Sequence, residues 1–395
     1  MVKIKISEDI FWVGIVDWDV RDFHGYLTEH GTTYNAYLIV DEKTALVDTV
    51  KYPFHEELVE KINEIIGLEQ LDYIVINHVE MDHSSALPYI IKEAKNAKIV
   101  ASKKGKESLT KHYGENLAIE AVKTGDRLKL GKRTLTFIEA PMLHWPDSMF
   151  TYVVEDAILM PNDAFGQHLA TSARFDDEVD EALLMREAAK YYANILMPLS
   201  ELVKSKIQEI IDMKIPIRII APSHGVIWRS NPVKIVEAYR RWSEGVPKDK
   251  AVIVYDSMWG STAMMARAIA DGIASQGVEV KFFKLRESDV TEIVTEILEA
   301  KAVVVGSPTL NNSMFPAVSA FLTYVTGLKP KGKLWAFFGS YGWGGGAVKQ
   351  MMEITKKAGF EVYESPLEVR YVPTSSEIKE CLNFGRSIAQ KMKSY

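Results

Sequence analysis

The sequence contains very little cysteine. Cys381 is the only one among 395 residues, and a single thiol excludes intrachain disulfides, four-cysteine metal sites and cysteine-ligated iron–sulfur clusters. Any metal bound by this chain is therefore expected to be held by His, Asp and Glu. Cys381 lies in a helical pattern, where we expect it to serve as a packing residue.

Long apolar runs and an excess of basic charge are also absent. No apolar stretch reaches the roughly 18 residues that span a bilayer, and residues 1–6 lack the apolar core of a signal peptide. The formal net charge is −6, whereas a nucleic-acid groove would need a basic stripe. We therefore expect a cytoplasmic protein that binds neither a membrane nor nucleic acid.

The length and the pattern of the chain predict two domains, residues 1–247 and 248–395. A chain of 395 residues is longer than one core usually supports. Up to about residue 245, short apolar strands dominate and a few helices interrupt them, which is typical of an αββα sandwich of the α+β class. The polar segment Ser243–Lys250 ends that pattern. The five alternating strands and helices that follow predict an α/β domain with a doubly wound, five-stranded parallel sheet.

The hydrophobic periodicity also predicts the individual elements. In the first domain we expect strands at 36–40, 45–47, 73–76, 98–101, 134–138, 150–154 and 157–160, and helices near 54–66, 86–95, 179–194 and 200–213. In the second domain we expect strands at 251–255, 278–283, 302–305, 334–338 and 360–366, and helices near 261–275, 287–299, 316–326, 345–358 and 375–393.

A dense group of metal-binding side chains follows the apolar strand at 73–76. His78, Glu80, Asp82 and His83 occupy four of six consecutive positions. Neighbouring carboxylates repel each other, and buried charges need partners, so this arrangement favours a bound cation over a solvated polar loop.

Three further metal-competent residues each come just after an apolar strand: His144, Asp163 and His224. One such residue alone is more often a structural histidine or a turn aspartate. Segments that converge at one edge of a sandwich make a shared metal site the better hypothesis.

This set of residues resembles the metallo-β-lactamase superfamily, in the variant found in flavodiiron proteins, also called A-type flavoproteins. The resemblance implies that one iron is held by His78, Glu80 and His144, the other by Asp82, His83 and His224, with Asp163 bridging them. Hydrolases of the superfamily usually have histidine at the position of Glu80.

Three carboxylates make the set hard and anionic, which suits iron better than an imidazole-rich zinc pocket does. Two ferrous ions carry about +4, which three carboxylates and a hydroxide would neutralise. The resemblance also implies that His24, Tyr26 and Tyr192 lie near the irons, where a ring could donate a hydrogen bond to bound oxygen species.

A second site is predicted in the carboxyl-terminal domain, in the loop between its first strand and first helix. Hydroxyls, a glycine and a helix amino terminus form an anion cradle there, and no P-loop lysine is present, so a phosphate ester fits better than ATP hydrolysis. The loop resembles the phosphate loop of flavodoxins, although Trp259 replaces their usual hydroxyl residue.

The resemblance implies that FMN is bound by three loops at the carboxyl edge of the sheet. These are Ser257, Met258, Trp259, Gly260, Ser261 and Thr262; Ser307, Pro308, Thr309, Leu310, Asn311 and Asn312; and Ser340, Tyr341, Gly342, Trp343, Gly344 and Gly345.

Together the two sites predict an oxidoreductase that reduces O₂ to water, NO to N₂O, or both. Reduced FMN can release two electrons, and the two ferrous ions together can release two more. These four electrons match the reduction of O₂ to two waters. The resemblance implies rubredoxin or a similar small carrier as a separate donor chain, and a head-to-tail homodimer or a dimer of dimers. Two alternatives remain at this stage: a dizinc hydrolase on the same first-domain fold, and an electron carrier that uses FMN alone.

Overall fold

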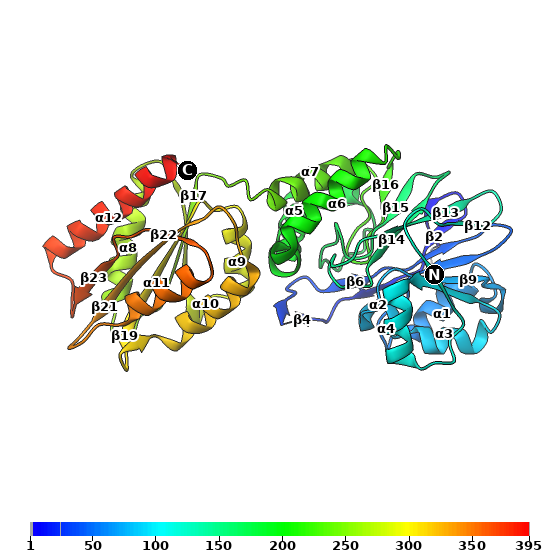
Figure 1. The fold of residues 1–395 in the computed structure, drawn as a ribbon, viewed down its shortest axis with the longest axis horizontal. Helices are drawn as coiled ribbons and strands as arrows, with labels where there is room; N and C mark the ends of the chain where they lie inside the picture. The colour runs from blue at the N-terminus through cyan, green and yellow to red at the C-terminus, as the bar shows by residue number, and fades with distance from the viewer. Residues whose placement is uncertain (1–2, 24, 395) are drawn as a thin grey trace. The chain divides into compact units, whose positions relative to one another are not determined.

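The computed structural model describes residues 3–23 and 25–394, which form two compact units (Figure 1). By its contacts, the first unit comprises Met1–Tyr191 and Glu201–Arg240, and the second comprises Tyr192–Ser200 and Arg241–Tyr395, within the described part of the chain. The segment 192–200 therefore packs with the second unit, although the first unit surrounds it in the sequence. We retain 1–247 and 248–395 as the proposed domains.

The first unit contains two packed sheets. The larger has the order β1-β2-β7-β8-β9-β10-β11 and the smaller the order β12-β13-β14-β15-β16. The strands of the larger sheet are β1 (Ile4–Ser7), β2 (Ile10–Trp12), β7 (Tyr37–Ile39), β8 (Ala45–Val47), β9 (Tyr73–Ile76), β10 (Lys98–Ser102) and β11 (Ile119–Val122). Those of the smaller sheet are β12 (Arg127–Lys129), β13 (Thr134–Glu139), β14 (Met149–Val153), β15 (Ile158–Met160) and β16 (Ile219–Ile220). Two small ribbons pair β3 (Ile15–Asp17) with β6 (Thr32–Tyr34) and β4 (Asp22–Phe23) with β5 (Tyr26–Leu27).

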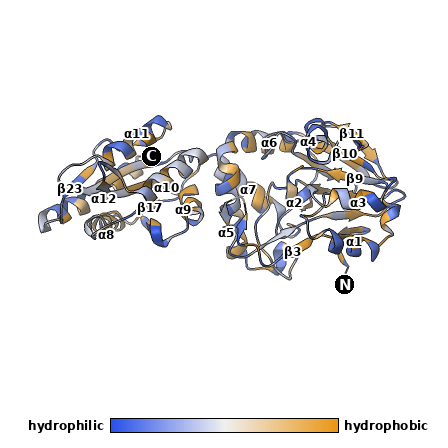
Figure 2. Cartoon of the chain, turned by 90° about the horizontal axis from the view of Figure 1, so that it is seen from below, coloured by the Kyte–Doolittle hydropathy of each residue, from blue (hydrophilic) through white to orange (hydrophobic). Residues whose placement is uncertain are grey.

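Helices complete the first unit. They are α1 (His55–Asn63), α2 (Met81–Ser84), α3 (Leu87–Glu93), α4 (Lys103–Tyr113), α5 (Glu181–Tyr191), α6 (Ser200–Asp212) and α7 (Pro232–Ser243). In Figure 2, α1 and α3 carry both hydrophilic and hydrophobic segments, as expected for helices with one buried face. A π-helix, Tyr192–Leu196, and a 3₁₀ turn, Met197–Leu199, follow α5.

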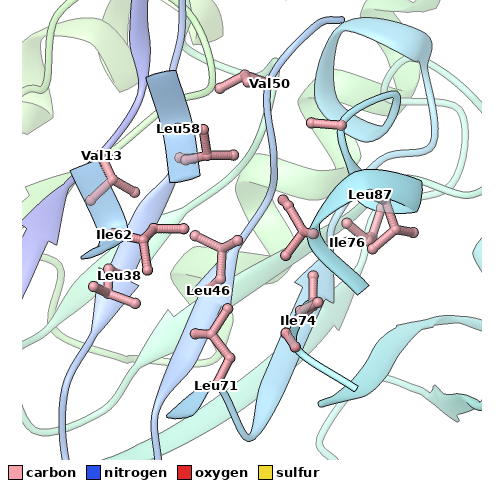
Figure 3. Packing of buried hydrophobic residues seen from close by; sticks show 14 of the residues in the cluster. Val13, Leu38, Leu46, Val50, Leu58, Ile62, Leu71, Ile74, Ile76 and Leu87 are labelled. Carbon is pink, nitrogen blue, oxygen red and sulfur yellow. The ribbon is translucent and has the colours of Figure 1, made fainter. Parts of the chain in front are cut away.

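The two cores of this unit follow from the alternation of side chains along each strand. Leu46 and Ile74 lie in the core that α1 and α3 cover, together with Leu58 and Leu87 (Figure 3). Their strand neighbours face the second sheet, where Val75 packs in a separate core. Because successive strand residues point to opposite faces, these strands are buried on both sides and are apolar throughout. The predicted αββα sandwich is confirmed.

The second unit is a parallel sheet with the strand order β18-β17-β19-β21-β22. Its strands are β17 (Lys250–Tyr255), β18 (Glu279–Lys284), β19 (Ala302–Leu310), β20 (Ser313–Met314), β21 (Leu334–Tyr341), β22 (Glu361–Val362) and β23 (Leu367–Arg370). Its helices are α8 (Ser261–Ala274), α9 (Val290–Leu298), α10 (Pro316–Leu328), α11 (Ala347–Lys357) and α12 (Ser375–Lys393). The order is that of a flavodoxin-like sheet, which confirms the predicted fold class. Cys381 is buried in the core of this unit, as expected.

The fifth strand corrects one prediction. A continuous strand was expected at 360–366, but the structure has β22 at Glu361–Val362 and resumes pairing with β21 only at β23, Leu367–Arg370. Pro366 lies in the interruption, where it lacks a backbone N–H for the ladder. Because β23 pairs with the last residues of β21, the residues after β23 lie at the carboxyl edge of the sheet.

No helix among residues 3–23 and 25–394 is long and apolar enough to cross a bilayer.

Candidate metal centre and flavin cavity

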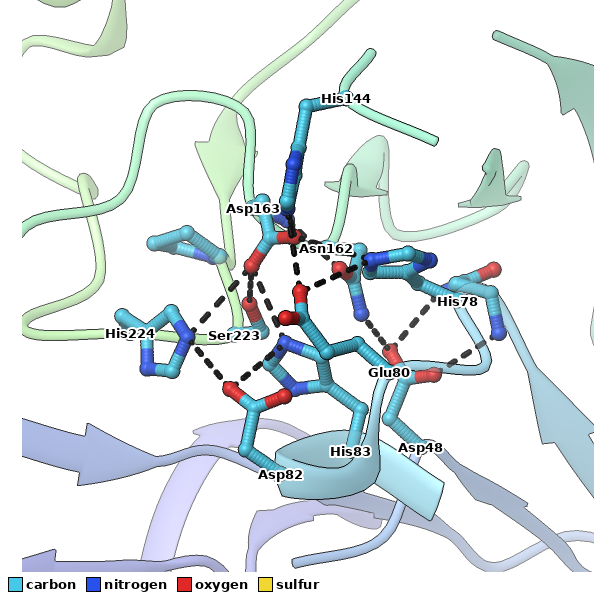
Figure 4. Close-up of polar contacts among 12 residues, drawn as sticks. Asp48, His78, Glu80, Asp82, His83, His144, Asn162, Asp163, Ser223 and His224 are labelled. Atoms are coloured by element: carbon cyan, nitrogen blue, oxygen red, sulfur yellow. Dashed lines mark hydrogen bonds and ion pairs between the residues drawn. The ribbon is translucent and has the colours of Figure 1, made fainter. Parts of the chain in front are cut away.

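The seven predicted metal ligands meet at one edge of the first unit's sheets (Figure 4). They form two groups whose ligand atoms lie within 4.8 Å of one another. His78, Glu80, His144 and Asp163 make the first group, and Asp82, His83 and His224 make the second. The structure thus brings together every one of the predicted ligands.

Asp163, a member of the first group, also reaches the second group. Its Oδ2 is 3.1 Å from Nε2 of His144 and 3.6 Å from Nε2 of His78. Its Oδ1 is 3.1 Å from Nε2 of His83 and 3.5 Å from Nε2 of His224. One carboxylate oxygen therefore faces each group, which is the arrangement of a bridging ligand.

The other two carboxylates each serve one group. Glu80 Oε2 lies 3.3 Å from Nε2 of His78 and 3.2 Å from Nε2 of His144. Asp82 Oδ2 lies 3.1 Å from Nε2 of both His83 and His224. Ligands about 2.1 Å from a metal and at right angles to each other are about 3.0 Å apart, so these separations fit the edges of two coordination shells.

Hydrogen bonds to the second ring nitrogen orient two of the histidines. Nδ1 of His224 lies 2.6 Å from the carbonyl oxygen of Thr33, and Nδ1 of His78 lies 2.9 Å from Oδ2 of Asp147. Because a carbonyl oxygen only accepts, Nδ1 of His224 must donate, and the lone pair of a neutral ring then points from Nε2 into the cluster. Asp147 was not predicted; it also accepts from the backbone N–H of Val79 at 2.7 Å.

The cluster concentrates buried negative charge that either protons or metal ions must balance. Oδ2 of Asp82 and Oδ2 of Asp163 are buried. Each lies 3.1 Å from a histidine Nε2, which donates a hydrogen bond only when that nitrogen carries a proton. Burial alone would lower the pKa of His83 and His144, but the carboxylates around them raise the pKa of each to about 9. Protons can therefore balance the metal-free site, and metal ions that replace them would release those protons. The residues present fit a pair of hard metal ions.

The surrounding loops are held rigidly. Asp48 accepts from the backbone N–H of Asn77 at 2.8 Å and from Nδ2 of Asn162 at 3.2 Å, which fixes the loops that carry His78 and Asp163. Gly225 follows His224 with φ +76°, and a Cβ there would lie 1.6 Å from Oε1 of Gln167, so only glycine fits.

Aromatic residues cover the second group. The ring of His168, a residue to which no role was assigned, lies 4.9 Å from His224 and 5.2 Å from Tyr26 between centroids. Tyr26 is buried, and its place near the irons stays a prediction. His24 lies outside the described residues.

For Tyr192 the structure points elsewhere. Its hydroxyl is 2.9 Å from Oγ of Ser200, and its ring packs on Trp242 in the second unit. The preceding residue, Tyr191, has its ring centroid 6.1 Å from that of His224. Successive residues near a helix end point in different directions, so the role expected of Tyr192 fits Tyr191 better. Burial, with Asp163 and other nearby acidic groups, raises the pKa of Tyr191 well above its ordinary value, which keeps the hydroxyl protonated.

The second unit contains a cavity of about 550 Å³ at the carboxyl edge of its sheet. Fifteen of the eighteen predicted cofactor residues line it; Gly260, Ser307 and Gly345 do not. Tyr371 and Val372, which follow β23, also line it and were not predicted. They lie there because β23 pairs with the last residues of β21 and therefore ends at the carboxyl edge of the sheet.

The cavity combines an anion cradle with an aromatic rim. Gly260, with φ +93°, precedes the first residue of α8, so the free N–H groups of the helix face the loop. Trp259 and Trp343 on the rim are 89% and 92% exposed. A size within the usual range of cofactor sites, a phosphate cradle and aromatic surface fit a flavin mononucleotide.

Asn311 and Asn312 have positive φ, and they link β19 to β20 as a two-residue hairpin. Asparagine tolerates that conformation, which explains the pair at this rim.

Comparisons with known proteins match two parts of the chain to two families. Residues 32–225 match the family described as ODP family beta lactamase, and residues 253–385 match the flavodoxin family. The chain is 54% identical to a nitric oxide reductase of Moorella thermoacetica over 98% of each chain. It superimposes with a TM-score of 0.97 on rubredoxin oxygen:oxidoreductase from Desulfovibrio gigas, at 40% identity, covering 100% of this chain and 99% of the other. The flavodiiron protein of Giardia intestinalis matches at 38% identity and TM-score 0.97, covering 100% and 98%. The flavodoxin match implies a flavin, and the cluster of histidines and acidic residues supports a diiron site.

Proposed function

The chain belongs to the flavodiiron protein family, and on that premise we propose that it reduces O₂ to water, NO to N₂O, or both, at two iron ions supplied with electrons through FMN. The relatives reported above are named for these two reactions. The flavodoxin-like unit has no part in a dizinc hydrolase, and the seven-residue cluster has none in a simple flavin carrier. The reductase accounts for both sites.

The position of Asp163 carries the proposal. Its two oxygens face two separate groups of ligand atoms, each with its own carboxylate. A single-metal site would leave one group of buried charges without a cation. Three carboxylates within seven ligands favour iron over zinc by ligand hardness.

When bound, the irons and the flavin supply the redox chemistry, two electrons from each, which together match the four needed by O₂. The residues of the chain hold the cofactors and control water. Thr33 and Asp147 orient His224 and His78 toward the metal positions. The rings of His168 and Tyr191 lie beside that of His224, and Tyr26 packs on His168, so these rings limit the access of water to the second group.

We propose a rubredoxin-type protein as the electron donor. The Desulfovibrio gigas relative is named as a rubredoxin oxidoreductase, and one cysteine among 395 residues cannot hold a four-cysteine iron site in this chain. We also propose a head-to-tail homodimer, in which the flavin of one chain serves the irons of the other. The exposed tryptophans at the flavin cavity support a covering partner there.

The test is anaerobic. The purified protein is analysed for iron and FMN and reduced completely, and O₂ or NO is then added while gas consumption is followed. We expect two irons and one FMN per chain and consumption of at least one gas. The variant Asp163→Ala should lose both irons and the activity while keeping FMN. Fully loaded and reduced wild-type protein that consumes neither gas would refute the proposal.

A further inference from the structure

An ion pair lies directly behind the predicted phosphate loop. Asp256 follows β17 and is fully buried, and Arg286 follows the neighbouring parallel strand β18. Nε of Arg286 donates to both carboxylate oxygens of Asp256 at 3.0 Å, and Nη2 lies 2.9 Å from Oδ1. Arg286 itself is half exposed. The pair thus joins the ends of two strands at the cofactor edge of the sheet.

The same guanidinium also holds the loop. Nη2 of Arg286 donates to the carbonyl oxygen of Ser257 at 2.8 Å, and Oδ1 of Asp256 accepts from the N–H of Ser257 at 2.7 Å. Oγ of Ser257 in turn accepts from the N–H of Gly260 at 3.1 Å. The first turn of the loop is therefore set by contacts that start at Arg286.

A buried carboxylate at this position is an electrostatic problem for a phosphate site. A phosphate monoester carries about −1.5 to −2 charges at neutral pH, and Asp256 is adjacent in sequence to the loop that would bind it. Two anions in a poorly solvated region repel each other strongly unless a cation lies close to one of them. Arg286 supplies that cation by a hydrogen-bonded pair of the strong, charge-assisted type.

We propose that Arg286 is a positioning residue that makes this loop selective for the phosphorylated flavin, by neutralising Asp256 and fixing Ser257. The inference rests on the flavin part of the proposed function and not on the gas reaction. It predicts that the loss of Arg286 weakens the binding of the phosphate much more than that of the isoalloxazine ring, which would be held by other residues of the cavity.

The experiment compares FMN with riboflavin, which lacks the phosphate. The flavin is removed from the full-length protein, and each ligand is titrated back while flavin fluorescence is followed. For Arg286→Gln we expect FMN affinity to fall about 10- to 100-fold and riboflavin affinity to change by less than about threefold. Arg286→Lys should restore part of the FMN affinity. Lys281→Gln, which removes a partly exposed positive charge from β18 itself, is the matched control and should leave both affinities unchanged.

A double-mutant cycle tests whether Arg286 acts through Asp256. In an Asp256→Asn background the buried charge is gone, so Arg286→Gln should change FMN affinity by less than about threefold. This double variant also removes the unpaired buried charge that could prevent Arg286→Gln from folding.

The outcomes separate the two proposals. Wild-type protein that binds no FMN would contradict the proposed function itself. An unchanged FMN affinity in Arg286→Gln, an equal loss for FMN and riboflavin, or an undiminished loss in the Asp256→Asn background would overturn the role of Arg286 while leaving the proposed function intact.

Discussion

The histidine ligands differ in what holds the ring nitrogen that faces away from the metals. His78 donates to the buried carboxylate of Asp147 and His224 to the carbonyl oxygen of Thr33, whereas Nδ1 of His83 has no partner in the described part of the chain. A carboxylate partner makes the imidazole a better ligand and fixes its tautomer. Asp147 should therefore matter most for the first group of ligands.

We expect Asp147→Asn to weaken metal binding about 10- to 100-fold. The asparagine keeps the size of the side chain but removes the charge that strengthens His78 as a ligand. Iron content is measured after dialysis against increasing chelator concentrations, where one iron per chain should be lost before the other. Asp177→Asn, an exposed aspartate paired with Arg229, is the matched control. Identical retention of both irons in the two variants would contradict this role.

The ligands themselves could be predicted from the sequence, but their supporting residues could not. His78, His144 and His224 each follow an apolar strand, and the carboxyl ends of these strands, from both sheets, meet at one edge of the sandwich. Thr33 and Asp147 carry no such signal, because their role depends on which residue faces the second ring nitrogen. Asp147 lies three residues after His144, but nearness in sequence to one ligand does not say that it faces another, His78. Tyr191 and Tyr192 could not be told apart, because both are aromatic and adjacent.

Secondary-structure elements were easier to predict where both faces of a strand are buried. Continuous apolar runs gave β9, β17 and β21 within a few residues. A strand was predicted at 360–366, but its interruption was missed. The two pieces, β22 and β23, are each short and pair with different halves of β21. That break is also why Tyr371 and Val372 were not predicted in the flavin cavity.

The strands β17 and β21 bring two buried lysines to the amino-terminal edge of the second unit's sheet. Lys250 is paired with Glu296 at 2.8 Å, whereas Nζ of Lys333 donates to the carbonyl oxygen of Leu298 at 3.0 Å. Burial, assisted by the nearby charge of Lys250, lowers the pKa of Lys333 from 10.5 to about 7. The folded state therefore disfavours the charged form of Lys333.

This shift gives stability a defined pH dependence. Below about pH 7 Lys333 is protonated in both states, so burial of its charge destabilises the fold fully. Between about pH 7 and 10.5 only the unfolded chain holds the proton, so this destabilisation declines as pH rises. We expect Lys333→Met to stabilise this unit by about 2 kcal/mol near neutral pH, and by progressively less toward pH 10.5.

Urea unfolding, followed by release of flavin fluorescence at several pH values, measures this difference. Lys349→Met, at an 81% exposed lysine, should show no comparable pH-dependent gain. A gain for Lys333→Met that stays constant across the pH range would contradict this prediction, because it would show that Lys333 has the same pKa in the folded and the unfolded chain.

At the scale of the whole molecule, the two sites lie in separate units of one chain, and electrons must pass from the flavin to the irons. The proposed head-to-tail dimer makes this transfer occur between chains, so it can be tested by complementation. Asp163→Ala removes the metal site and keeps the flavin. Ser261→Asp places a carboxylate at the start of α8, where the phosphate is expected, and keeps the metal ligands.

Heterodimers of these two variants, purified with two different tags, contain one intact flavin site and one intact metal site in different chains. If the flavin of one chain serves the irons of the other, they should recover about half of the wild-type activity, because one of the two pairs is complete. A wild-type chain paired with the double variant Asp163→Ala, Ser261→Asp is the matched control: its two intact sites are in the same chain, so it should be inactive. Activity in that control, together with inactive complementing heterodimers, would place electron transfer within each chain and refute the head-to-tail arrangement.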